Sequence, residues 1–244
     1  MTPIPESPSI LKRLFPSGIP YSVALLVEYE PDSIWYETSL TIAAQALQEE
    51  VKTEYHTFLR APGQIREALT KLGVNPAEKE RDEMLTVIDS YTAQIGIGAP
   101  EGPKESVIRR TLKISDWSIA VGQDLKRVLD VGEIEEHLHI DDSFSVLLQY
   151  NEEKSVLDWV RTRNLPAIRS HKALWFLAVA TGIASESFYR QLELLCDGIL
   201  DFKSEEKEGE LAHYLRLRAM RGKPFDSRWR KLQVSEHGEV TLAD

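Results

Sequence analysis

The chain alternates short apolar runs with segments in which apolar residues recur at helical spacing. Continuous apolar and β-branched runs are typical of strands covered on both faces, whereas spacings of three and four residues indicate amphipathic helices. The predicted strands are residues 22–27, 55–59, 85–88, 139–148, 174–179 and 198–202, and the predicted helices are residues 38–51, 62–72, 117–129, 152–160 and 186–195. Strands that alternate with helices predict an α/β fold, a three-layer α/β/α sandwich around a mostly parallel sheet.

The two ends of the chain depart from this alternation. Residues 1–17 contain four prolines and predict an extended N-terminal lead-in with one short apolar turn at Ile10 and Leu11. Residues 18–244 then form a single domain. Beyond residue 210 apolar and polar residues alternate, which predicts an antiparallel C-terminal extension of the sheet. The charged stretch 75–83 predicts a solvated turn, and Thr38 or Ser39 is expected to cap the first long helix.

Composition limits the function classes. The 244 residues carry a net charge of −10, which argues against non-specific binding to nucleic acid or to an anionic membrane. Cys196 is the single cysteine, so an intrachain disulfide and a cysteine-rich zinc site are excluded, and we expect it to fill core space. The longest apolar run, residues 173–180, is too short to cross a bilayer, and the N-terminus lacks a basic leader, so a cytoplasmic protein is expected.

Six short segments between about residues 14 and 242 keep the order and spacing of one family's motifs. They are residues 18–20, 30–31, 58–66, 140–148, 196–200 and 217–222. Together they resemble the KaiC/RadA branch of the RecA-like ATPases, particularly the single-domain KaiC-like proteins common in archaea. The resemblance implies a RecA-like fold of the P-loop NTPase type. It places Asp142 at the Walker B aspartate and Arg221 at the arginine of the finger that faces a neighbouring subunit.

The chain departs from this family at the residues that touch phosphate. A phosphate-binding loop reads G-x-x-x-x-G-K-[ST], in which glycines let the backbone surround the phosphates and lysine meets them. The glycine, glycine, lysine and hydroxyl positions here are Tyr29, Ile34, Trp35 and Tyr36. The nearby acids Glu30, Asp32 and Glu37 would repel an anion. The phosphate-binding loop is therefore degenerate.

The other catalytic positions of the family have changed as well. The resemblance places Leu59 and Arg60 at the paired glutamates that activate water, and Ala219 at the lysine that reaches the neighbour's terminal phosphate. Asp142 and Arg221 persist as vestigial nucleotide-binding positions. We therefore expect no ATP hydrolysis, no enzymatic activity and no cofactor, including ATP and Mg²⁺.

The segment 213–231 is basic and contains interleaved aromatic residues. Subunit or protein contact is the favoured interpretation, with a solvated hairpin and a nucleic-acid surface as alternatives. The candidate interface residues are Trp35, Arg218, Arg221, Arg228, Trp229 and Arg230. For Trp35 and Tyr36 two interpretations stay open: anchors of an interface, or side chains that fill the vacated nucleotide cavity.

Two further groups of residues carry candidate chemistry. His137 and His139, together with Asp141 and Asp142, form a pattern that suits a metal, because alternate residues of a strand share a face. A solvated strand entry explains the histidines, and the resemblance explains Asp142 as a Walker B remnant, so no metal site is expected. Ser143 and Ser145 have no partners that the sequence places, so a hydrolase triad is not expected.

The main hypothesis is a catalytically inactive KaiC/RecA-like pseudo-ATPase. It would act as a regulatory or scaffold subunit, as a homo-oligomer or in a hetero-assembly with an active KaiC- or RadA-like ATPase. Two alternatives remain: a sensor that binds nucleotide by a non-standard route through Asp142, and a nucleic-acid accessory protein related to recombinase paralogues.

Overall fold

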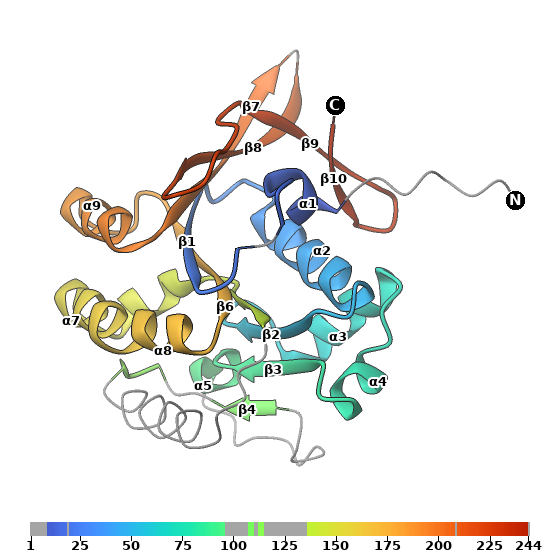
Figure 1. Cartoon of the computed structure of the whole chain (residues 1–244), viewed down its shortest axis with the longest axis horizontal. Coiled ribbons are helices and arrows are strands. Elements are labelled where there is room, and N and C mark those ends of the chain that lie inside the picture. Colours follow the sequence, from blue (N-terminus) through green and yellow to red (C-terminus); the bar gives the residue numbers. More distant parts are fainter. Residues whose placement is uncertain are drawn as a thin grey trace, which may run out of the picture.

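The computed structural model describes residues 9–18, 20–95, 107–109, 112–114, 136–207 and 209–243. A sheet with the strand order β10-β9-β8-β7-β1-β6-β5-β2-β3-β4 runs through the molecule (Figure 1). The strands are β1 (Val23–Tyr29), β2 (Lys52–Thr57), β3 (Leu85–Asp89), β4 (Val107–Arg109), β5 (His137–Asp141), β6 (Ala173–Ala180), β7 (Gly198–Lys207), β8 (Glu210–Met220), β9 (Arg230–Val234) and β10 (Val240–Leu242). From β4 at one edge of the sheet to β7, neighbouring strands pair in parallel. From β7 to β10 at the other edge they pair antiparallel, as predicted.

Helices cover both faces of the sheet and complete the predicted three layers. They are α1 (Ile10–Leu14), α2 (Trp35–Gln48), α3 (Pro62–Lys71), α4 (Pro76–Arg81), α5 (Tyr91–Ile95), α7 (Glu153–Trp159), α8 (Leu165–Ser170) and α9 (Glu186–Leu195), with a 3-10 turn η1 (Phe144–Gln149) and a π turn η2 (Val160–Asn164). In Figure 1, α1 to α4 lie on one side of the sheet and α7 to α9 on the other. The helix predicted at 117–129 lies outside the described residues.

Each face of the sheet has its own apolar core because successive strand residues point to opposite faces. Leu25 and Tyr55 pack with α2 and α3, whereas Leu26 and Trp175 pack with α7, α8 and α9. Strand β6 is buried along its whole length. The central strands are thus covered on both faces, which explains their continuous apolar runs.

Three local predictions were wrong. Helix α2 begins at Trp35, so Thr38 and Ser39 lie inside it and do not cap it. Their hydroxyls donate instead to the carbonyls of Ile34 and Tyr36. The charged stretch 75–83 is mostly helix α4, whose N-cap Asn75 accepts from the backbone of Glu78. Strand β5 ends at Asp141, and the chain continues as the 3-10 turn η1 instead of further strand.

The segment expected to be an extended lead-in contains helix α1. Ser9 caps this helix by accepting from the backbone of Lys12. Ile10, Leu11 and Leu14 are 2%, 3% and 5% exposed and belong to the core on the α2 side. A short helix forms here because these three apolar side chains find a common buried face.

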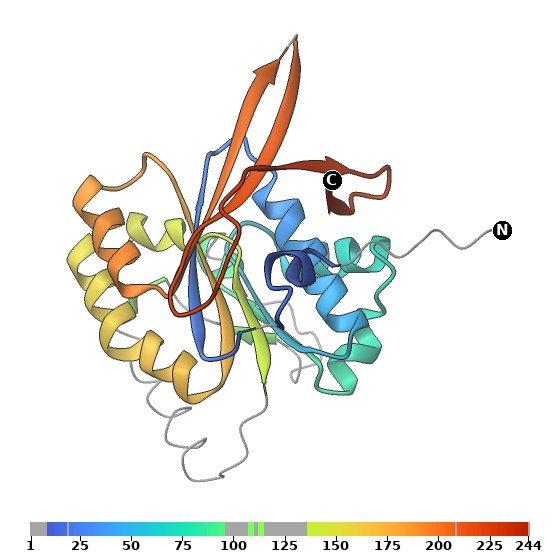
Figure 2. The same cartoon turned by 45° about the horizontal axis from the view of Figure 1, so that its top comes forward.

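The antiparallel end of the sheet differs in shape from the rest. The long hairpin of β7 and β8 projects beyond the helical layers (Figure 2). Within the part of the chain that the structure describes, no helix combines the length and apolar character that a membrane crossing requires.

Candidate functional site

The loops after β1, β5 and β6 meet at the carboxyl edge of the sheet. Strand β1 lies between β7 and β6 in the sheet. The chain leaves β1 into helix α2 on one face of the sheet, whereas it leaves β6 into helix α9 on the other face. In open α/β sheets, ligands bind at such a point where successive connections diverge. This edge is therefore where the sequence-predicted nucleotide site is to be sought.

Trp35 occupies the interior beneath this edge. Its side chain is 1% exposed, and its indole Nε1 donates to the carbonyl oxygen of Asp142 at 2.9 Å. The indole lies 6.3 Å from the ring of Phe176 and meets that of Phe202 edge-on at 5.3 Å between centroids. Of the two interpretations of Trp35, interior filling is the one that the structure supports. As an interior residue, Trp35 offers no surface to an interface.

The neighbouring degenerate positions link the loops to one another. The hydroxyl of Tyr29 and that of Ser143 are 2.7 Å apart, which connects the end of β1 to the loop after β5. Ile34 precedes α2 as its N-cap residue and offers no capping side chain. The half-buried ring of Tyr36 lies under the guanidinium of Arg60, with 5.4 Å from Cζ to the ring centroid. Burial, then the nearby Asp142, raise the pKa of Tyr36 to about 12, so its phenol stays neutral.

Asp142 holds the connection between β2 and α3. Its carboxylate accepts from the backbone N–H of Phe58 at 2.8 Å, from that of Leu59 at 3.4 Å and from the hydroxyl of Thr57 at 3.1 Å. The residue is 0% exposed, and burial raises its pKa to about 7 against the effect of these hydrogen bonds. Both carboxylate oxygens are therefore engaged inside the protein.

Leu59 and Arg60 lie just after strand β2. The resemblance gives these two positions to the glutamates that activate water. Leu59 packs partly buried against the core on the α7 side, and Arg60 is exposed. Neither supplies a carboxylate. Together with the indole at the lysine position and the engaged Asp142, these residues do not fit Mg-ATP.

The last residue of β6, Ala180, is bonded by side chains from two other elements, η1 and α9. The Ser145 hydroxyl accepts from the backbone N–H of Ala180 at 2.7 Å, and the Tyr189 hydroxyl donates to the Ala180 carbonyl at 2.6 Å. These bonds close the carboxyl end of β6. The alternative of a nucleotide sensor at this edge therefore receives no support from the geometry.

The C-terminal basic segment is largely paired within the chain. Arg218 forms ion pairs with Glu28 at 2.7 Å, Glu193 at 2.6 Å and Asp201 at 3.3 Å, and so ties β8 to β1, α9 and β7. Arg216 pairs with Asp201 at 2.7 Å. Arg218, predicted at an interface, is thus an internal tie between elements.

The remaining interface candidates lie nearer the surface. Arg221 is exposed and donates to the carbonyl of Leu194 at 2.7 Å, and the guanidinium of Arg228 is paired with Asp226. Arg230 is half-buried and donates to the carbonyl of Arg13. The ring of Trp229 lies 4.4 Å from the Lys203 ammonium and also 4.4 Å from the Arg216 guanidinium. With these cations engaged internally, the geometry gives a nucleic-acid surface no support.

A polar cluster that the sequence interpretation recognised only in its β5 residues lies on the α7 side of β2 and β5. His137 and His139, expected at a solvated strand entry, are 11% and 15% exposed in their side chains, so that expectation was wrong. Parallel pairing sets Glu54 beside His139 and His56 beside Asp141. The signal was present as polar residues at every second position of two strands, but their adjacency depends on the strand order.

His56 is the centre of this cluster. Its Nδ1 lies 2.8 Å from an oxygen of Asp141, and its Nε2 lies 2.8 Å from the hydroxyl of Ser90. This is the hydrogen-bond order of a serine hydrolase triad, but Ser90 is 0% exposed and cannot meet a substrate. Burial would lower the pKa of His139, yet its hydrogen bonds with Asp141 and Glu54 outweigh burial and raise that pKa to about 10.

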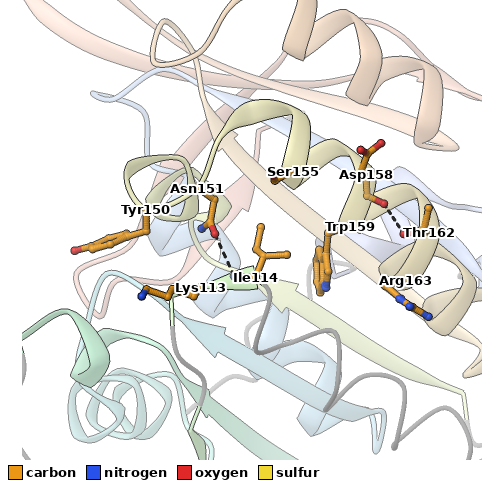
Figure 3. Close-up of a pocket in the computed structure, with 9 residues that line it drawn as sticks. All are labelled: Lys113, Ile114, Tyr150, Asn151, Ser155, Asp158, Trp159, Thr162 and Arg163. Carbon is orange, nitrogen blue, oxygen red and sulfur yellow. Dashed lines mark hydrogen bonds between the residues drawn. The ribbon is translucent and has the colours of Figure 1, made fainter.

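A separate pocket of about 480 Å³ lies beside α7 and η2 (Figure 3). Its lining residues are Lys113, Ile114, Tyr150, Asn151, Ser155, Asp158, Trp159, Thr162 and Arg163. Asn151 orders one wall by accepting from the backbone of Ile114 and donating to the carbonyl of Leu112. None of the degenerate phosphate-loop positions reaches this pocket.

Comparison with known proteins supports the fold. No family model matches the sequence, and no curated protein matches it. An uncharacterized protein of Pyrococcus horikoshii, crystallised with an unknown peptide, is 16% identical with a TM-score of 0.71, over 96% of each chain. A KaiC-like protein of Pyrococcus horikoshii OT3 is 12% identical with a TM-score of 0.71, over 99% of this chain and 100% of the other. The chain has the RecA-like fold of KaiC-like proteins.

Proposed function

We propose that this chain is a RecA-fold pseudo-ATPase that acts as a regulatory or scaffold subunit. The observation that carries the proposal is Trp35, whose indole is buried at the lysine position of the phosphate loop and bonded to the Asp142 carbonyl. Polyphosphate binding at such a loop needs backbone N–H groups and a cation around the anion. The apolar indole of Trp35 is not a cation, and the acids nearby in the sequence, Glu30, Asp32 and Glu37, would repel an anion.

Loss of hydrolysis does not remove the surfaces through which RecA-type domains assemble. Arg221, at the position of the finger arginine, remains exposed beyond the end of β8. In a hetero-assembly this guanidinium would face the nucleotide of an active relative, and in a homo-oligomer it would form a structural contact. We propose that assembly through this side of the molecule is the retained function.

The first test measures nucleotide directly. Mg-ATP is titrated into the purified chain by calorimetry, and phosphate release is followed in parallel. We expect no turnover and no binding tighter than about 1 mM, which corresponds to about −4 kcal/mol. Micromolar affinity, or turnover abolished by Asp142→Asn, would contradict the loss of the ATP site.

The second test measures assembly. Light scattering after gel filtration is applied to the chain alone and mixed with an active KaiC-like ATPase of the same organism. We expect an oligomer or a mixed complex that Arg221→Glu weakens at least about tenfold. Arg81→Glu is the matched control, because Arg81 is a 71% exposed arginine on α4. A strict monomer that leaves the active ATPase unchanged would sink the scaffold proposal.

A further inference from the structure

The buried polar cluster on the α7 side of the sheet contains three ligand atoms that converge on one point. They are Nδ1 of His56, Nε2 of His139 and Oδ1 of Asp141, which all lie within 4.8 Å of one another. The Asp141 oxygen is 2.8 Å from the His56 nitrogen and 3.5 Å from the His139 nitrogen. A tetrahedral zinc ion with bonds of about 2.0–2.1 Å separates its ligand atoms by about 3.3 Å. The spacing of the three atoms is therefore close to that of a metal site.

The outer atoms of all three residues are held by further partners. Nδ1 of His139 meets a carboxylate oxygen of Glu54 at 2.8 Å, and Nε2 of His56 meets the Ser90 hydroxyl at 2.8 Å. Trp175 donates its indole N–H to the second oxygen of Asp141 at 2.5 Å. Metal-binding histidines typically donate their other ring N–H to a carboxylate, carbonyl or hydroxyl, which fixes the ring and its tautomer. The cluster has this outer layer for each ligand.

The cluster places ionisable groups in the protein interior. Asp141 and His56 have side chains that are only 3% and 4% exposed. Burying ionisable groups is expensive, and well-packed apolar residues in their place are often neutral or stabilising. A divalent cation that replaced the ring proton at Nε2 of His139 would balance the two carboxylates of Glu54 and Asp141.

We propose that His56, His139 and Asp141 bind a divalent transition-metal ion of the zinc class. Two imidazoles and one carboxylate are ligands that such ions accept, whereas a harder and larger ion such as Ca²⁺ requires about six to eight oxygen ligands and would lack them here. Exposure rises from Asp141 at 3% through His139 at 15% to Glu54 at 31%, so the ion enters along the row from the Glu54 end. The cluster lies on the face opposite α2, so this inference does not depend on the proposed loss of ATP binding.

The test uses the full chain without a histidine tag, stripped with EDTA and titrated with ZnCl₂ by calorimetry and with CoCl₂ by absorption spectroscopy. We expect one ion per chain with a dissociation constant below about 1 μM, together with the intense visible bands of low-symmetry Co²⁺. Wild-type protein that shows no saturable binding of either ion would overturn the proposal.

Variants locate the ion. His139→Gln removes a ligand and should weaken Zn²⁺ binding by more than about 100-fold, while Glu54→Gln keeps a hydrogen bond and should weaken it by about 10–100-fold. Glu54 is more exposed than His139, so Glu54→Gln is expected to disturb folding less than His139→Gln does. Circular dichroism checks that both variants are folded. His237→Gln is the control because His237 is exposed on the turn before β10. Equal Zn²⁺ affinity in His139→Gln and His237→Gln would place the ion elsewhere and refute the site.

Discussion

Trp35 shows how one substitution changes both chemistry and stability. A lysine at this position would bring a flexible cation toward the loop, whereas the indole adds a rigid apolar ring to the core beside Phe176 and Phe202. A buried indole normally finds a partner for its N–H, and here the Asp142 carbonyl accepts it. The residue at the position that the resemblance gives to the phosphate-loop lysine therefore joins α2 to the loop after β5.

Trp35→Phe should destabilise the protein by about 1–3 kcal/mol, because it leaves a small cavity and an unpaired carbonyl at Asp142. Urea unfolding measures the change. Trp229→Phe is the matched control, since Trp229 is half-buried and its contacts with Lys203 and Arg216 are at the surface; it should cost less than about 1 kcal/mol. Equal losses in the two variants would show that the buried hydrogen bond and packing of Trp35 carry no special weight.

At the scale of elements, Arg218 joins four of them through three carboxylates. Arg218 lies on β8, and its guanidinium contacts the carboxylates of Glu28 on β1, Glu193 on α9 and Asp201 on β7. Arg216 also pairs with Asp201, so two cations face three carboxylates and do not neutralise them, and the Glu28 side chain is only 12% exposed. Burial, opposed by Arg218 and reinforced by Glu193 and Asp201, raises the pKa of Glu28 from 4.5 to about 7.

This raised pKa predicts a pH-dependent stability. The folded state keeps the Glu28 proton over a range where the unfolded chain has lost it, so stability falls as pH rises from 4.5 to about 7. Glu28→Gln removes this dependence. Its free energy of unfolding relative to wild type should rise between pH 5 and 8 by up to about 3 kcal/mol.

Chemical denaturation across that pH range checks the sign as well as the size. Glu186→Gln is the control, because the Glu186 side chain is 86% exposed, and surface pairs contribute little. It should differ from wild type by less than about 0.5 kcal/mol at every pH. If the stability of Glu28→Gln relative to wild type fell as pH rose from 5 to 8, the raised pKa would be contradicted.

At the scale of the whole molecule, the N-terminal helix and the C-terminal strands close one core together. Arg13 donates to the carbonyl of Leu242, and Arg230 donates to the carbonyl of Arg13. The backbone of Ile10 donates to Gln45 of α2. Apolar residues of α1, α2 and β10 belong to the same core cluster. The first helix is therefore part of the domain that the sequence pattern began at residue 18.

Leu11→Ala should consequently cost about 2–4 kcal/mol, as expected for a large side chain removed from a core. Thermal and urea unfolding measure it. Lys12→Ala is the neighbouring control: the Lys12 side chain is 58% exposed and pairs with Glu49, so its loss should cost less than about 1 kcal/mol. If Leu11→Ala were as mild as the control, α1 would be peripheral to the fold.

The sequence by itself determined the layer architecture and the parallel core with an antiparallel finish, and it shows no G-x-x-x-x-G-K-[ST] motif after the first strand of the core. Those features follow from local periodicity and from residue types at single positions, such as Trp35 in place of lysine. Only the tertiary structure decided that the Trp35 side chain turns inward, that Asp142 bonds the backbone of Phe58, and that β2 lies beside β5. These depend on contacts between residues tens of positions apart, and a pattern with a period of two or four residues carries no information about which strands become neighbours.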